Sequence, residues 1–566
     1  MKFCDMEYRR PALEEIKSAY GGFLKSLEEA GSFEQAERAY LEADKTGRHI
    51  SSMSALCYIR HDIDTRDEFY AAEMDFFDQN GPVFEEWAQD IGKALVKSPF
   101  KGDFDRKYGD LLTKNVEIAL EAFSPEIISE MQKENALVTE YGKLIASAKI
   151  AFEGETYTLS QLSPIKESRD DARRRAAWEA EGRFFMENAD KLDGIYTELA
   201  ALRQEMGQKL GFESFTELGY RRMMRNSYTK EDVERFREEV VRTVVPAAER
   251  IYRARAKRMG FDYPMSYADA IMQFESGNPR PQGGPDDIMA AGRDFYHGLS
   301  NETTEFIDFM IENGLFDVLS REGKAVGGFC TEISDYESPF IFANFNGTSH
   351  DVEVMTHEAG HAFAAYEARG IIPSDYQSPT LEACEIHSMT MEFFGWSHAA
   401  EFFGKDAEKF KYSHLSGAIT FIPYGVMVDH FQHIVYENPG MSAAGMHGEW
   451  RRLMGIYTPW IDPAGMSFYG EGRGWQRQTH IYQAPFYYID YCLAQSVALQ
   501  FFALMQKDRQ AAWEKYHALV KMAGTKTFTE LVVSSGLKNP FAQGALKEAC
   551  EMAGKWLDGV SSEALR

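Results

Sequence analysis

The chain has 566 residues, of which 44% are hydrophobic and 26% are charged, and its formal net charge is −27. This length exceeds the size at which one core normally keeps growing, so we expect at least two lobes. The strong negative charge argues against nucleic acid or an anionic membrane as a partner.

The sequence predicts a cytoplasmic protein whose first 150 residues form a series of helices. The N-terminus lacks the apolar run of a signal peptide, and no stretch approaches about 18 uninterrupted apolar residues. The six cysteines are scattered, which suits reduced thiols. Residues 12–150 show helical apolar spacing, and residues 150–159 predict a hairpin that turns at Glu153 and Gly154.

Further helices and one strand are predicted before residue 350. Capping patterns at residues 168–171 and 229–232 each start a helix. The glycine- and proline-rich residues 277–285 form the clearest loop. Residues 337–345 are short, β-prone and bounded by turn residues, so they predict a strand.

Residues 357–361 read His-Glu-Ala-Gly-His, and they are the most informative segment of the chain. At i and i+4 of a helix, His357 and His361 can both reach one Zn²⁺, and Glu358 can take a proton from a water at the metal. Gly360 costs about 1 kcal/mol relative to Ala, so we expect something to approach the backbone there. Gly370 is expected to end this helix in the left-handed conformation. The alternative is a solvated helix with two histidines.

A second helix, predicted over residues 381–395, offers a third ligand. Glu385 and Glu392 are seven residues apart and share one face, so Glu385 is favoured as a ligand over a solvated carboxylate. Glu382 lies near the helix start, where it favours the helix dipole. His387 points about 200° away from Glu385 and is the weaker candidate.

Together these segments resemble the thimet oligopeptidase and oligoendopeptidase F family of zinc metallopeptidases. That family's pattern is His-Glu-x-Gly-His, followed some two dozen residues later by Glu-x-x-Ser-x-x-x-Glu. The resemblance implies one Zn²⁺ per chain, bound by His357, His361 and Glu385, with Glu358 as the general base. It also implies that Glu392 orients a ligand imidazole. Ala364, where many members carry another histidine, resembles the oligoendopeptidase F and Pz-peptidase branch.

The resemblance extends to residues that would contact substrate. His480, Tyr488 and Tyr491 are expected to donate hydrogen bonds to the oxyanion of the reaction. We expect substrate contacts from five further residues, with β-augmentation along the strand: Phe342, Ala343, Asn344, Tyr482 and Tyr487. The alternatives are an ordinary buried strand and core aromatic residues. His430 and His433 suggest a second metal site, but structural histidines are the favoured interpretation.

The sequence therefore predicts a mainly α, zincin-like fold, with two helical lobes around a deep channel and a small β-sheet beside the active-site helix. We expect an N-terminal helical lobe over residues 1–190 and a catalytic domain over residues 191–566. The resemblance implies a zinc-dependent endopeptidase, monomer or homodimer, whose substrates are short oligopeptides. The alternatives are a zinc carboxypeptidase or dipeptidyl carboxypeptidase, which needs a cation for the substrate's carboxylate, and a non-catalytic zinc-containing peptide-binding protein. The intact Glu358 argues against the last.

Overall fold

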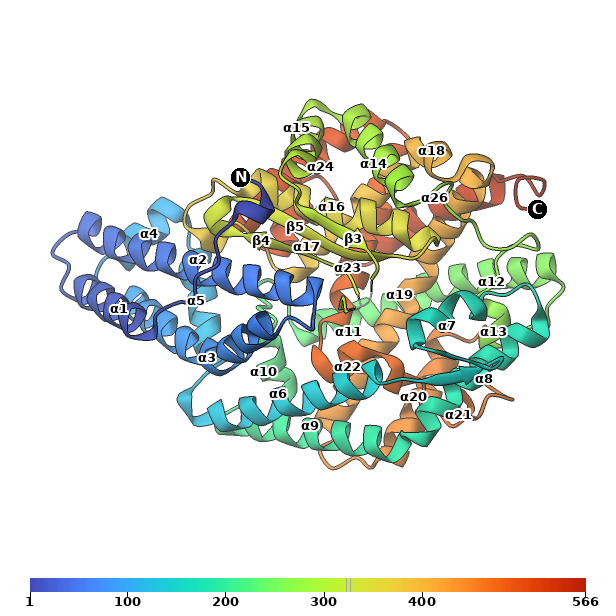
Figure 1. The fold of residues 1–566 in the computed structure, drawn as a ribbon, viewed down its shortest axis with the longest axis horizontal. Coiled ribbons are helices and arrows are strands. Elements are labelled where there is room, and N and C mark those ends of the chain that lie inside the picture. Colours follow the sequence, from blue (N-terminus) through green and yellow to red (C-terminus); the bar gives the residue numbers. More distant parts are fainter. Residues whose placement is uncertain (322, 326) are drawn as a thin grey trace.

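The computed structural model describes residues 1–321, 323–325 and 327–566, and its fold is mainly α with small sheets, as predicted. Figure 1 shows the first helices (blue) as a lobe at one end of the molecule. The remaining helices surround the long helices α19 (Ala407–Glu437) and α23 (Tyr488–Met505).

The N-terminal lobe has a hydrophobic core of its own, which includes Tyr40, Leu95 and Phe104. Its helices are α1 (Leu13–Glu28), α2 (Phe33–Ile63), α3 (Glu68–Lys97), α4 (Lys101–Tyr108) and α5 (Leu111–Glu121). From α6 onward, side chains such as Tyr141 belong to the larger core. The helices between residues 128 and 190 thus pack with later ones, and a lobe boundary at residue 190 stays a prediction.

Helices also dominate the middle of the chain. They are α6 (Ile128–Ala146), α7 (Leu159–Lys166), α8 (Asp171–Glu187), α9 (Ala189–Lys209), α10 (Phe215–Arg222), α11 (Lys230–Glu239), α12 (Val245–Met259), α13 (Tyr267–Ala270), α14 (Pro285–Leu299) and α15 (Asn301–Glu312). The predicted hairpin is present as β1 (Ile150–Phe152) and β2 (Glu155–Tyr157), with positive φ at Glu153 and Gly154. The side chain of Asp170 caps α8, and Thr229 and Asp232 form the capping box of α11.

A three-stranded sheet lies beside the histidine-bearing helix α16 (Ser349–Ala368). Its order is β3-β5-β4, with β3 (Phe316–Leu319) parallel and β4 (Phe329–Ile333) antiparallel to β5 (Ser338–Phe345). The predicted strand is therefore the central one, and both of its edges are paired. β3 and β4 are the two edge strands, and α2 of the N-terminal lobe packs against β4.

Close packing of α16 against α17 (Leu381–Phe394) explains the glycine between the two histidines. A Cβ on Gly360 would lie 2.8 Å from Ser388 Cα and 2.9 Å from the His387 carbonyl oxygen, so only glycine permits this approach. The loop before α16 is held by Asp351, which accepts backbone hydrogen bonds from Asn346 and Gly347. Gly370 does not have a positive φ, so the predicted left-handed helix end is absent there.

The remaining helices complete the C-terminal part of the fold. They are α18 (Ala399–Phe403), α20 (Ala443–Tyr457), α21 (Ser467–Gly470), α22 (Thr479–Gln483), α24 (Arg509–Met522), α25 (Phe528–Ser534) and α26 (Ala545–Gly559). By length and composition, α23 is the one helix in the described ranges that is apolar enough to cross a membrane, but 78% of it is buried inside the protein. A helix that is apolar on all sides and covered by protein is a core helix.

Candidate metal centre

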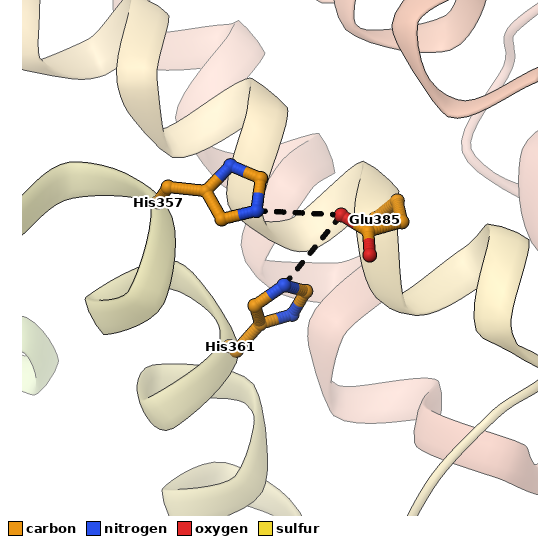
Figure 2. Close-up of side chains that lie close together, drawn as sticks. All are labelled: His357, His361 and Glu385. Carbon is orange, nitrogen blue, oxygen red and sulfur yellow. Dashed lines mark ion pairs between the residues drawn. The ribbon is translucent and has the colours of Figure 1, made fainter. Parts of the chain in front are cut away.

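Three side chains from two helices converge on one point. Figure 2 shows His357 and His361 on α16, facing Glu385 on α17. Glu385 Oε2 lies 3.4 Å from His357 Nε2 and 3.6 Å from His361 Nε2. The candidate ligand atoms all lie within 4.8 Å of one another. Two imidazole nitrogens and one carboxylate oxygen match the donor set of catalytic zinc sites, so the residues present fit the metal.

The hydrogen bonds around Glu392 orient His357 toward this cluster. Glu392 Oε1 lies 2.6 Å from His357 Nδ1, and Glu392 Oε2 lies 2.6 Å from His414 Nε2. Trp396 Nε1 donates to His414 Nδ1 over 3.1 Å, so the proton of His414 is on Nε2 and points at Glu392. With Nδ1 of His357 donating to the other oxygen, the lone pair on Nε2 is free for a metal.

The same histidines keep Glu392 ionised. Burial alone would raise its pKa, but the hydrogen bonds from His357 and His414 outweigh burial and hold the pKa at about 2. The sequence did not indicate His414, because it lies 22 residues beyond Glu392 on α19 and no local spacing connects the two.

Glu385 is held by two hydroxyl groups in addition to the histidines. Ser388 Oγ donates to Glu385 Oε2 over 3.1 Å, and the Tyr487 hydroxyl donates to Glu385 Oε1 over 2.8 Å. Burial raises the pKa of Glu385, but the nearby His361 and His357 outweigh it and hold the pKa well below its usual value. Glu385 is therefore an ionised, oriented carboxylate.

The aromatic cluster after residue 480 lies beside this site. The ring of His480 lies 4.9 Å from that of Tyr488 and 5.8 Å from that of Tyr491, between ring centroids. The rings of Tyr487 and Tyr491 are 4.9 Å apart. Burial raises the pKa of Tyr491, with smaller contributions that include the charges of Glu385 and Glu358, so its hydroxyl keeps its proton and can donate.

Two cavities are lined by residues of the metal cluster or by residues that contact it. The larger one, of about 550 Å³, is lined by Glu392, His480, Tyr488 and Tyr491, among others. The smaller one, of about 280 Å³, is lined by residues that include His361, Glu385, Tyr487 and three residues of β4: Cys330, Thr331 and Glu332. Ala364 also lines the smaller cavity.

Four of the predicted substrate-binding residues lie elsewhere. Tyr482 is fully buried, stacks on Tyr141 with ring centroids 3.9 Å apart, and donates its hydroxyl to the Leu192 carbonyl. Phe342 and Ala343 are fully buried in the central strand, and Asn344 donates to the carbonyls of Ala325 and Gly327. Tyr482 therefore belongs to the core. The three residues of β5 cannot bind a peptide by β-augmentation, because both edges of β5 are already paired. The edge strand that reaches a cavity is β4.

The other histidines considered as metal ligands lie outside the metal cluster. His387 is buried, which lowers its pKa to about 3, and it does not belong to the group with metal-ligand geometry. His430 pairs with the Tyr457 hydroxyl and His433 with the Tyr220 hydroxyl. Within residues 1–321, 323–325 and 327–566, the one group with metal-ligand geometry is that of His357, His361 and Glu385.

Glu382 has a different role from the one expected at a helix start. It is fully buried, and its Oε2 lies 3.3 Å from Arg225 Nη1. The guanidinium of Arg225 also lies 2.5 Å from Asp490 Oδ1 on α23. Local spacing gave no sign of this buried cluster, because its three members are far apart in the sequence.

Comparisons with known proteins agree with this arrangement. The family model described as Peptidase M3 N-terminal domain matches residues 3–123, and the model described as Peptidase family M3 matches residues 299–551. No curated protein matches the chain in the corresponding comparison.

Three solved structures are similar over the whole chain. A protein assigned as oligoendopeptidase F, solved by X-ray crystallography, is 46% identical, with full coverage of both chains and a TM-score of 0.96. PZ peptidase A, solved with an inhibitor, is 44% identical, covering 99% of this chain and 100% of its own, with a TM-score of 0.95. A protein assigned as oligoendopeptidase F from Bacillus anthracis is 42% identical, covering 100% and 99%, with a TM-score of 0.91.

Proposed function

Given that this chain belongs to peptidase family M3, in the branch of oligoendopeptidase F and Pz-peptidase, and is thus a metalloendopeptidase, we propose that it hydrolyses short oligopeptides with one zinc ion. The observation that carries the proposal is the convergence of His357, His361 and Glu385, with Glu358 adjacent to the first ligand. Bound zinc would supply Lewis acidity to the scissile carbonyl and would acidify the attacking water.

The protein's own residues would handle the proton and hold the ligands. Glu358 is half-buried and directly follows the candidate ligand His357 on α16. From there it would accept the proton of the attacking water and deliver it to the leaving amine. Glu392 would hold His357, and Tyr487 and Ser388 would hold Glu385.

The oxyanion donors would come from the larger cavity. Tyr487 already donates its hydroxyl to Glu385. His480, Tyr488 and Tyr491 face the larger cavity instead and are the candidates for donors to the oxyanion. The substrate backbone would lie along β4, whose outer edge has no strand partner among the described residues.

Charge distribution favours an endopeptidase over a carboxypeptidase. A carboxypeptidase needs a cation that binds the C-terminal carboxylate of its substrate. In the part of the chain that the structure describes, no lysine or arginine lines either cavity, whereas Glu167, Glu353 and Glu332 do. Cavities of about 550 and 280 Å³ also suit short extended peptides.

A cytoplasmic location and a monomeric or dimeric state belong to the same proposal. All six cysteines are free, which suits a reducing compartment.

Glu358→Gln tests the mechanism. The amide cannot accept the proton, so we expect kcat to fall on the order of 100- to 10,000-fold with peptide substrates. Zinc content should stay at one ion per chain, because the three ligands are unchanged. The proposed mechanism would be wrong if this variant kept full activity with its zinc bound.

A further inference from the structure

Phe486, directly before the two tyrosines Tyr487 and Tyr488, has a backbone conformation that is rare for its residue type. Its φ is +67°, although its side chain is large and fully buried. The left-handed region disfavours bulky L-residues, so surrounding contacts must hold such a residue in place. The turn at Phe486 lies between α22 and α23, so its backbone conformation determines how the chain is oriented at Tyr487.

The surroundings of Phe486 fix both its backbone groups and its ring. Its N–H donates to Gln432 Oε1 over 3.2 Å, and its carbonyl accepts from Arg225 Nη2 over 2.8 Å. A Cβ on Gly219 would lie 2.5 Å from Phe486 Cδ2, so the ring occupies the space that this glycine leaves open. The turn is thus held from three sides.

Arg225 connects this turn to both helices of the site. Its Nη1 lies 3.3 Å from Glu382 Oε2, one helical turn before the ligand Glu385 on α17. Its Nη2 lies 2.5 Å from Asp490 Oδ1 in the first turn of α23. The side chains of all three residues are at most 1% exposed, so the ion pairs are not screened by water.

We infer that Arg225 is a positioning residue that sets the strained turn at Phe486 and thereby places the Tyr487 hydroxyl on Glu385. The guanidinium is suited to this because its fork of donors contacts two carboxylates and one carbonyl at once, which a lysine ammonium cannot match in the same geometry. The inference rests on the proposed function, since it assigns Glu385 to the metal.

A buried arginine that only stabilises the fold is the competing explanation, and Arg203 provides the comparison. It is also fully buried, it donates to the Tyr482 carbonyl four residues before Phe486, and it lies 2.6 Å from Glu134. Arg203 therefore has the same chemistry on the same segment, but it has no contact with the turn or with α17 among its described partners.

A double-mutant cycle between Arg225→Lys and Tyr487→Phe tests the inference, with the zinc dissociation constant and kcat as readouts. Arg203→Lys in both backgrounds is the matched control. We expect Arg225→Lys and Tyr487→Phe each to weaken zinc binding about 10-fold. The double variant should bind zinc within about 2-fold of Tyr487→Phe alone, because the two changes remove one interaction. Arg203→Lys should have the same effect in both backgrounds.

Two results would overturn the inference: unchanged zinc binding in Arg225→Lys, or losses that multiply fully in the double variant. If Arg225→Lys does not fold, Gln432→Met takes its place, since it removes the other hydrogen bond to Phe486 and should be non-additive with Tyr487→Phe in the same way. If the wild type binds zinc and the variants show this coupling, but the wild type cleaves no peptide, only the proposed function would be refuted.

Discussion

At the scale of single residues, the central feature of the site is the pair of hydrogen bonds that Glu392 accepts. One oxygen accepts a hydrogen bond from His357 Nδ1, and the other accepts one from His414 Nε2. The carboxylate thus links a candidate ligand on α16 to a histidine on α19. This fixes the tautomer of both rings. A ligand imidazole held in this way loses little freedom when the metal binds, which is how an outer carboxylate raises metal affinity.

Replacing Glu392 by Gln should therefore weaken zinc binding about 10- to 100-fold. The amide NH2 group would face an imidazole N–H, so one of the two hydrogen bonds would be lost. Chelator competition measures this. Glu367→Gln is the matched control, since Glu367 is on α16, the helix of His357, has a side chain that is 15% exposed like that of Glu392, and accepts a hydrogen bond from His517 over 2.8 Å. Equal zinc affinity in Glu392→Gln and wild type would show that Glu392 does not orient His357.

At the scale of elements, the site depends on how closely α16 and α17 approach. The spacing of His357 and His361 places both rings on one face of α16, but only the contact at Gly360 brings Glu385 within reach of them. The sheet also depends on contacts between distant segments. β3 and β4 pair with the two edges of β5, and β4 lines the smaller cavity.

Gly360→Ala should push the two helices apart, since the new methyl group would meet backbone atoms rather than a flexible side chain. We expect a loss of about 1–3 kcal/mol in the free energy of unfolding, together with weaker zinc binding. Gly194→Ala on α9 is the control: a Cβ there meets nothing within 4 Å, so better helix propensity should stabilise the protein by up to about 1 kcal/mol. If Gly360→Ala were as stable as that control and bound zinc normally, the close approach would not be needed.

At the scale of the whole molecule, local patterns predict the mainly α fold, the hairpin at Glu153 and the capping box at Thr229, because each depends on residues close in sequence; α8 is capped by Asp170 rather than by Ser168. Contacts between distant segments gave no such signal. The strand order β3-β5-β4 could not be read from residues 337–345 alone, so β5 was wrongly expected to offer an edge.

The aromatic segment illustrates the same limit within the site. Spacing alone does not separate Tyr482, which packs in the core, from Tyr487, which reaches Glu385. The difference comes from the left-handed turn at Phe486, and that turn is held by Arg225 and Gln432 from elsewhere in the chain. The assignment of His480, Tyr488 and Tyr491 as oxyanion donors stays a prediction.

We propose that this molecule cleaves internal peptide bonds with a metal bound by His357, His361 and Glu385. Mass-spectrometric mapping of the products from short peptides blocked at both ends tests it most directly, with chelator-treated and zinc-restored protein compared. We expect internal cleavage that chelation abolishes and zinc restores. Cleavage that persists after complete metal removal, or cleavage only of peptides with a free C-terminus, would contradict this proposal.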